Sequence, residues 1–185
     1  MSVEERRQAI IDAVLPLLRE HGADISTRQI ADAAGVAEGT IFRAFGDKES
    51  LIAAAVDAYF DPLPFRASIR AIDRGLPTDE KIAQVLVLLR QRFDGAIRLM
   101  SALRMDPRSK VAGHHRHHDE SGWLGELDSV FRPEELAVPV ETLGYYLRLV
   151  AFGSTIPIFN ERHQFGDEEL LGLVLHGAIA HPRRT

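Results

Sequence analysis

Residues 26–51 read STRQIADAAGVAEGTIFRAFGDKESL, and this stretch decides the fold. Ser26 and Gln29 have the spacing of a capping box, which predicts a helix that begins directly after Ser26. Gly35 stands where a left-handed residue would end that helix. A second short helix fits residues 38–45 and ends at the next glycine. Two short helices joined by a turn that begins at Gly are the arrangement of a helix-turn-helix.

The apolar residues of this stretch are spaced so that the two helices can pack together. The residues expected to face inward are Ile30, Ala31, Ala34, Val36, Ile41 and Phe45. The second helix would then point Glu38, Gly39, Thr40 and Arg43 outward, and a helix of this size fits the major groove of DNA. The spacing by itself also fits a plain helical hairpin inside a bundle.

The rest of the chain also has the spacing of helices, with apolar residues three and four apart and no alternating strand pattern. Further helices are expected around residues 10–18 with a stop at Gly22, over 48–60 after an Asp47 cap, over 65–73, 78–105, 123–131 and 139–156, and from an Asp167 cap onward. Residues 107–122 are polar and are expected to form a loop. The prediction is an all-α protein of about nine helices.

Bulk composition excludes several classes of protein. The chain has 185 residues with 22 Lys and Arg against 27 Asp and Glu, so its net charge of -5 excludes a strongly basic nucleic-acid binder. Any DNA contact must come from a local patch. The absence of cysteine removes disulfides, Cys-ligated zinc, iron–sulfur clusters and thiol catalysis.

The longest apolar run, Leu51–Val56, is far shorter than the roughly 20 residues of a membrane span. Without a signal-peptide pattern, a soluble cytoplasmic protein with no membrane partner is expected.

Residues 27–51 resemble the DNA-binding signature of the tetracycline-repressor (TetR) family. The matching positions are Thr27, Ile-Ala at 30–31, Ala-Gly-Val at 34–36, Gly-Thr-aliphatic-aromatic at 39–42, an aromatic residue at 45 and Lys-Glu-x-Leu at 48–51. With the helix before it, the resemblance covers residues 5–60, about a third of the chain.

The resemblance implies a homodimer with two domains in each chain. Residues 1–60 would bind one half of a palindromic operator in double-stranded DNA. Residues 61–185 would form the dimer interface and a pocket for a small-molecule effector, whose binding releases the operator. The sequence does not identify the effector or the operator, and an activator, or a regulator without a ligand, stays open.

The resemblance also implies roles for single residues. Thr27 and Lys48 match positions that usually meet phosphates, and Arg28 and Glu38 match positions that often read bases. Three positions depart from the family pattern: Phe42 replaces a common Tyr, Ala44 a common His, and Ala37 a frequent capping Ser. The predicted DNA-binding residues are Thr27, Arg28, Glu38, Gly39, Thr40, Phe42, Arg43 and Lys48.

The effector pocket is predicted from the large side chains of residues 61–185. The candidates are Phe93, Ile97, Met100, Trp123, Tyr145 and Phe152. The same side chains would also suit core or dimer packing. As a pocket they favour an apolar effector with few charged groups, and Arg148 is one of three arginines that could meet an anionic group.

Neither catalysis nor a metal site is predicted. The chain has no phosphate-binding Gly-rich loop, no nucleophile elbow and no HExxH pair, so no cofactor is expected either. The histidine tract at residues 114–118 invites a metal, but it lies in the expected loop and has no carboxylate at a helical metal spacing. The alternative to a DNA-binding repressor is a helical-bundle small-molecule binding protein or enzyme that does not touch DNA.

Overall fold

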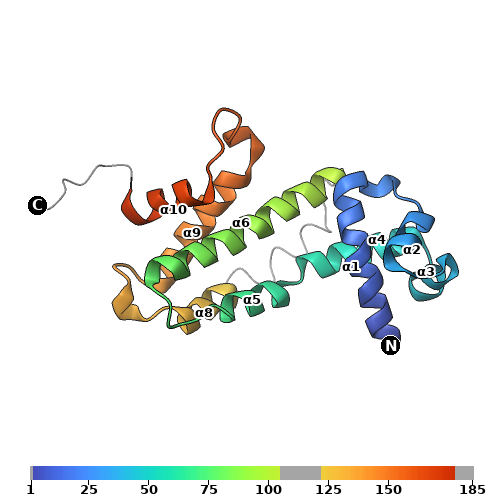
Figure 1. The fold of residues 1–185 in the computed structure, drawn as a ribbon, viewed down its shortest axis with the longest axis horizontal. Helices are drawn as coiled ribbons and strands as arrows, with labels where there is room; N and C mark the ends of the chain where they lie inside the picture. Colours follow the sequence, from blue (N-terminus) through green and yellow to red (C-terminus); the bar gives the residue numbers. More distant parts are fainter. Residues whose placement is uncertain (1, 105–121, 178–185) are drawn as a thin grey trace, which may run out of the picture. The chain divides into compact units, whose positions relative to one another are not determined.

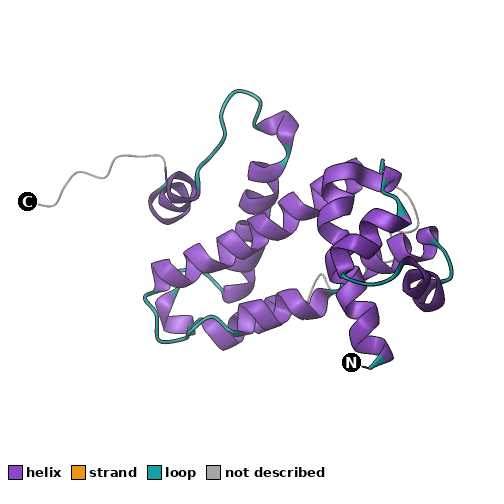
Figure 2. Ribbon diagram, turned by 45° about the vertical axis from the view of Figure 1, so that its right-hand side comes forward, coloured by secondary structure: helices purple, strands orange, loops and turns teal. Residues whose placement is uncertain are grey.

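The computed structural model describes residues 2–104 and 122–177. These residues contain nine α-helices and three short 3-10 helices, and no β-strand occurs among them (Figure 2). The predicted all-α class is therefore confirmed. The predicted loop at 107–122 and the histidine tract at 114–118 lie outside the described residues, except that Gly122 already belongs to a helix.

The order of the elements is seen in Figure 1. The first part of the chain forms α1 (Val3–His21), η1 (Gly22–Asp24), α2 (Thr27–Ala34), α3 (Glu38–Phe45), α4 (Lys48–Phe60) and α5 (Pro62–Arg70). The remainder forms α6 (Thr78–Ala102), α8 (Gly122–Val130), η2 (Pro133–Glu135), α9 (Val140–Thr155), η3 (Pro157–Phe159) and α10 (Asp167–His176).

The described residues divide into two compact units. The first contains residues 2–61 and 95–104, and the second contains residues 62–94 and 122–177, so α6 contributes to both. The core of the first unit consists of Ile10, Ile11, Val14, Leu18, Ile25, Ile30, Ala31, Ile41, Phe45, Leu51, Ala55, Val56 and Leu99. These residues come from α1 to α4, the segment after η1 and the end of α6, which hold the two short helices α2 and α3 in place.

The core of the second unit is larger and also contains charged residues. Its buried apolar side chains include Leu86, Leu127, Phe131 and Leu147, and α5 packs alongside α8 (Figure 1). Lys81 is fully buried, and its Nζ donates to both carboxylate oxygens of Glu135 at 3.1 and 2.9 Å. This hydrogen bond holds the pKa of Glu135 below its usual range.

A second charged group in this unit surrounds a carboxylate. Glu126 of α8 is buried and pairs with Arg66 at 2.8 Å and with Arg70 at 3.3 Å, both from α5. No buried side-chain nitrogen or oxygen in the described part of the chain lacks a hydrogen-bond partner. Charged pairs therefore join α5 to α8 and α6 to η2 without leaving a buried polar group unsatisfied.

Two predicted helix starts differ from the structure. The helix predicted over 65–73 begins at Pro62, because proline is accepted in the first turn of a helix, where its missing N–H needs no partner. The predicted Asp167 cap is wrong. Gly166 is the N-cap of α10 and Asp167 is its first residue, with its carboxylate paired to Arg90 of α6. A tertiary ion pair thus takes the place of a local cap.

Candidate nucleic-acid interface

The helix-turn-helix is built from local capping interactions. Ser26 Oγ accepts from the Gln29 backbone N–H at 3.2 Å, and Gln29 Oε1 accepts from the Ser26 N–H at 2.8 Å. Gly35 ends α2 in the left-handed conformation, with φ 64° and ψ 34°. The capping box, the Gly35 stop and the second helix over 38–45 are thus confirmed.

The inner face of α3 fixes its orientation on the rest of the unit. Ile41 is fully buried and Phe45 is nearly so, and both pack in the same core as Ile30 of α2. Arg7 of α1 donates to the Ala44 carbonyl and lies over the Phe45 ring, 4.3 Å from its centroid. The carboxyl end of α3 is therefore attached to α1, which limits how far its outer face can turn.

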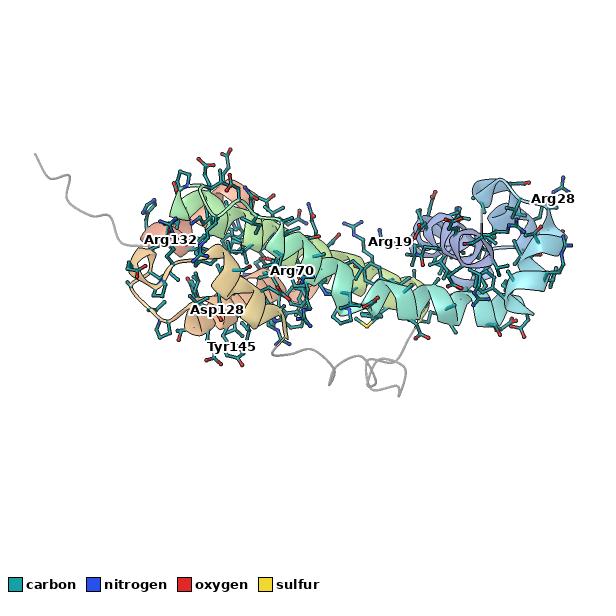
Figure 3. All side chains as sticks on the ribbon, turned by 90° about the horizontal axis from the view of Figure 1, so that it is seen from below. Arg19, Arg28, Arg70, Asp128, Arg132 and Tyr145 are labelled. Carbon is teal, nitrogen blue, oxygen red and sulfur yellow. The ribbon has the colours of Figure 1, made fainter. Side chains whose placement is uncertain are left out.

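The outer face of the two helices carries most of the predicted contacts. Arg28 is exposed and points away from the helices in Figure 3. Among the other predicted residues, those also exposed are Glu38, Gly39, Phe42 and Arg43, while Thr40 is half-buried. Arg43 Nε donates to the Gly39 carbonyl at 3.3 Å. α3 thus presents a short polar surface with one exposed aromatic ring.

Two of the predicted phosphate contacts make bonds within the protein. The Thr27 hydroxyl is hydrogen-bonded to the Glu38 carboxylate, which joins the first residue of α2 to the first residue of α3. Lys48 Nζ donates to the backbone carbonyls of Ala23 at 3.1 Å and Ile25 at 3.2 Å. Because an ammonium group has three donors, Lys48 keeps one for an external anion. The sequence carried no signal for either bond, since the partners are 11 and at least 23 residues apart.

The first 60 residues are acidic, with six Lys and Arg against ten Asp and Glu. Arg7 is engaged with α3, and the Arg19 guanidinium lies 5.0 Å from the centroid of the Tyr59 ring. The cations in and beside the two short helices are therefore Arg28, Arg43 and Lys48. Because these cations are few, a DNA phosphate backbone would interact with a few localised positive charges rather than with an extended positive potential.

Asp47 is the N-cap of α4, beside this surface. Its carboxylate accepts from the Ser50 backbone N–H at 2.7 Å as the helix cap, as the sequence predicts. Hydrogen bonds from Ser50 hold the pKa of the Asp47 carboxyl below its usual range. By contrast, Ala37 caps α3 without any side-chain hydrogen bond, as expected from the alanine at that position.

A cavity of about 510 Å³ lies in the second unit, between α6 and α9. Its lining consists of Phe93, Tyr145, Arg148, Leu149 and Phe152. Three of the six side chains predicted for the pocket are therefore brought together here. Leu149 is a lining residue that sequence reasoning missed, because an exposed leucine on a helix carries no signal of its own.

The other three predicted pocket residues do not line this cavity. Trp123 is buried in the core of the second unit, where its ring lies 6.2 Å from that of Phe65. Ile97 and Met100 belong to the part of α6 assigned to the first unit. Some large side chains of residues 61–185 thus line the cavity, whereas others pack in a core. The size of a side chain in the sequence does not show which of the two it does.

Over 2–104 and 122–177 no group of three or more His, Cys, Asp and Glu side chains is arranged to hold a metal ion. Within the same ranges no helix has the length and apolar character needed to cross a bilayer.

Comparison with known proteins agrees with this geometry. The family model described as "Bacterial regulatory proteins, tetR family" matches residues 10–55, which contain α2, α3 and their supports. A TetR transcription regulator from Haloarcula marismortui is similar in structure, with a TM-score of 0.58 and 21% identity over 95% of each chain.

Two further similar structures were solved with a bound small molecule. The regulator FadR from Bacillus subtilis, in complex with stearoyl-CoA, has a TM-score of 0.55 and 20% identity over 93% of this chain and 99% of that one. LfrR from Mycobacterium smegmatis, in complex with proflavine, has a TM-score of 0.55 and 20% identity over 97% of this chain and 100% of that one. At such identities the likeness establishes the fold.

The helix-turn-helix and the matched family model together define a DNA-binding transcriptional regulator rather than an enzyme. Residues 10–55, which contain the helix-turn-helix, belong to the tetR family of bacterial regulatory proteins.

Proposed function

We propose that the protein is a homodimeric repressor that occupies a palindromic operator and leaves it when a small apolar effector binds. In this proposal residues 1–60 form the DNA-binding domain and residues 61–185 form the effector-binding and dimerisation domain. One observation carries the proposal: the outer face of α2 and α3 is exposed, while their inner face is fixed by the buried side chains of Ile30, Ile41 and Phe45.

The DNA contacts would come from both ends of the helix pair. Arg28 is suited to guanine, whose O6 and N7 accept two hydrogen bonds from a guanidinium group. The third donor of Lys48 suits a phosphate oxygen, and Arg43, Gly39 and Thr40 lie on the face that would enter the major groove. Phe42 is 48% exposed and would give apolar contact, for example with a thymine methyl group.

A dimer is required because a palindrome has two half-sites, about 34 Å or a multiple of it apart. A suitable surface exists on α9 and η3. The exposed large apolar side chains there are Tyr145, Tyr146, Leu149, Phe152, Ile158 and Phe159. Ile158 and Phe159 are 70% and 71% exposed. Exposed large apolar side chains gathered on two successive elements are typical of protein interfaces, and a second copy of the chain is the occupant that a palindrome needs.

Light scattering coupled to gel filtration tests this interface. The double variant Ile158→Asp with Phe159→Asp should be monomeric at micromolar concentration, because two carboxylates would be buried without partners in the dimer. Leu63→Asp is the matched control, since Leu63 is also 60% exposed but lies on α5, and it should stay dimeric. A dimer that survives the double variant would place the interface elsewhere.

The effector would occupy the cavity between α6 and α9. The side chains that line it are apolar or aromatic except for Arg148, so an apolar molecule with at most one acidic group fits its chemistry. The complexes of FadR with stearoyl-CoA and of LfrR with proflavine support an effector with a large apolar part. Three residues, Tyr145, Leu149 and Phe152, belong both to this lining and to the proposed dimer face, so an effector here would act directly on the interface.

A mobility-shift assay on the region upstream of the protein's own coding sequence tests the whole proposal. The full-length protein should retard a palindrome-containing fragment at low salt, and a panel of fatty acids, acyl-CoA thioesters and planar aromatic cations should contain a compound that releases it. Absence of binding to any upstream palindrome at low salt would instead favour a helical small-molecule binding protein that does not touch DNA.

A further inference from the structure

Glu38 stands out on the outer face of the helix-turn-helix because it is an exposed acid at the start of the helix that would enter the groove. A recognition helix contacts base edges chiefly with its N-terminal residues, and Glu38 is the first residue of α3. The carboxylate at this position therefore lies where bases are read, and there it would have to find a hydrogen-bond donor or be repelled.

The carboxylate is held by a residue of the other helix. The Thr27 hydroxyl is hydrogen-bonded to Glu38, and threonine is a stiff side chain with few rotamers, here at a capped helix start. A free glutamate would lose much rotamer entropy on docking. A carboxylate already held by Thr27 loses less, so this bond prepares Glu38 for a contact of fixed geometry.

The same bond changes what Thr27 can do. A hydroxyl has a single donor hydrogen, and a carboxylate at neutral pH can only accept, so Thr27 is the donor in this pair. While the pair is intact, Thr27 cannot also donate to a phosphate oxygen. Its role is then to orient Glu38 rather than to meet the backbone of DNA.

Only some base edges offer a hydrogen-bond donor to the carboxylate, which is itself an acceptor. In the major groove cytosine offers the N4 amino group as a donor, whereas guanine offers only the acceptors N7 and O6. Adenine has a donor at N6 but also the acceptor N7 beside it, which would face the second carboxylate oxygen. Cytosine is therefore the base that best matches an ionised glutamate.

We infer that Glu38 selects a cytosine in each half-site of the operator, and that Thr27 is the positioning residue that holds its carboxylate for this contact. The inference rests on the proposed DNA binding and adds a base preference that DNA binding alone does not require.

In vitro selection from a pool of random duplex DNA, using the full-length protein, first defines the preferred half-site. Binding constants are then measured by fluorescence anisotropy on duplexes that carry each of the four base pairs at every half-site position. The wild type should prefer cytosine at one position by roughly 5- to 150-fold, the range of a good side-chain–base contact. Glu38→Gln should move this preference to adenine, which a glutamine amide reads through N6 and N7.

The control for charge is Glu49→Gln, because Glu49 is also exposed in the first turn of a helix of the same unit. It should leave the preference at every position unchanged. Thr27→Val, which keeps the shape and removes the hydroxyl, should narrow the cytosine preference by about fivefold, the effect of one lost hydrogen bond. Thr27→Ser should restore it.

The outcomes separate this inference from the proposed function. If the wild type selects no sequence, the proposed DNA-binding function fails. If it selects a half-site but Glu38→Gln raises affinity equally for all sequences, Glu38 merely repels phosphates and the inference is overturned. An unchanged cytosine preference in Thr27→Val would overturn the role of Thr27.

Discussion

Gly22 shows how a single residue can be required for two reasons at once. It ends α1 with φ 64°, a conformation that residues with a Cβ rarely adopt. A Cβ added there would also overlap the backbone carbonyl oxygen of Ala102 at the end of α6. The glycine therefore both reverses the chain after α1 and allows α6 to approach within the first unit.

Replacing Gly22 by alanine should lower the free energy of unfolding by more than about 1 kcal/mol, because neither the backbone nor the space is compatible with a side chain. Denaturant titration followed by circular dichroism measures the change. Gly39→Ala is the control, since Gly39 is helical and has nothing within 4 Å of an added Cβ. The control should be neutral or slightly stabilising, and equal losses in both variants would contradict the explanation.

Asp47 is a second single residue whose environment leads to a prediction: its contribution to the stability of the protein should depend on pH. The pKa of this carboxyl is lowered in the folded protein by the hydrogen bonds from Ser50, so its contribution to stability is complete at neutral pH. The contribution is lost as the pH falls below about 4 and through the lowered folded value. Asp47→Ala should therefore melt below the wild type at pH 7, with a difference that shrinks in acid. Asp47→Asn, whose amide oxygen can still cap, should melt closer to the wild type at pH 7, and its difference from the wild type should change with pH as much as that of Asp47→Ala, because neither variant titrates at this position.

At the scale of an element, α3 has two faces with separate tasks. Its inner face carries Ile41, which is fully buried, and its outer face carries Phe42, which is 48% exposed. Arg7 fixes the carboxyl end of the same helix on α1. Stability and DNA contact are thus assigned to adjacent residues of one helix.

Two alanine variants of α3 should separate these tasks. Ile41→Ala should cost about 2–5 kcal/mol of stability, since it leaves a cavity in the core that holds α3. Phe42→Ala should change stability by less than about 0.5 kcal/mol yet weaken operator binding. Thermal melting and fluorescence anisotropy on the same samples measure the two effects. Full operator affinity in Phe42→Ala would remove this ring from the interface.

At the scale of the whole molecule, charge is unevenly distributed. Residues 1–60 contain six Lys and Arg against ten Asp and Glu, although they form the proposed DNA-binding domain. The acidic excess does not prevent binding, because the affinity for phosphates depends on the few cations that face the DNA. It does predict a protein whose non-specific affinity for DNA is low.

Salt dependence measures how many cations take part. The logarithm of the binding constant should fall linearly with the logarithm of the salt concentration, with a slope of about -0.9 for each phosphate contacted. Lys48→Ala should make the slope of a dimer shallower by about two, one contact in each domain, as should Arg43→Ala. Arg74→Ala, at an exposed cation of the second unit, should leave the slope unchanged. Equal slopes in all variants would contradict the docking face.

The sequence by itself determined the class of the protein and the helix boundaries within residues 26–60. The Ser26 and Asp47 caps, the Gly35 stop and the second short helix depend on contacts within four residues along the chain, so their patterns are visible in the letters alone. The family match rests on the same stretch.

Only the tertiary structure decided which side chains meet. Thr27 reaches Glu38, Lys48 reaches the carbonyls of Ala23 and Ile25, and Asp167 pairs with Arg90 across 77 residues instead of capping its own helix. Burial likewise separated Trp123, in the core, from Tyr145 at the cavity. Capping is a local interaction that repeats in any helix, whereas these pairings exist only after helices distant in sequence have packed and brought their surfaces together.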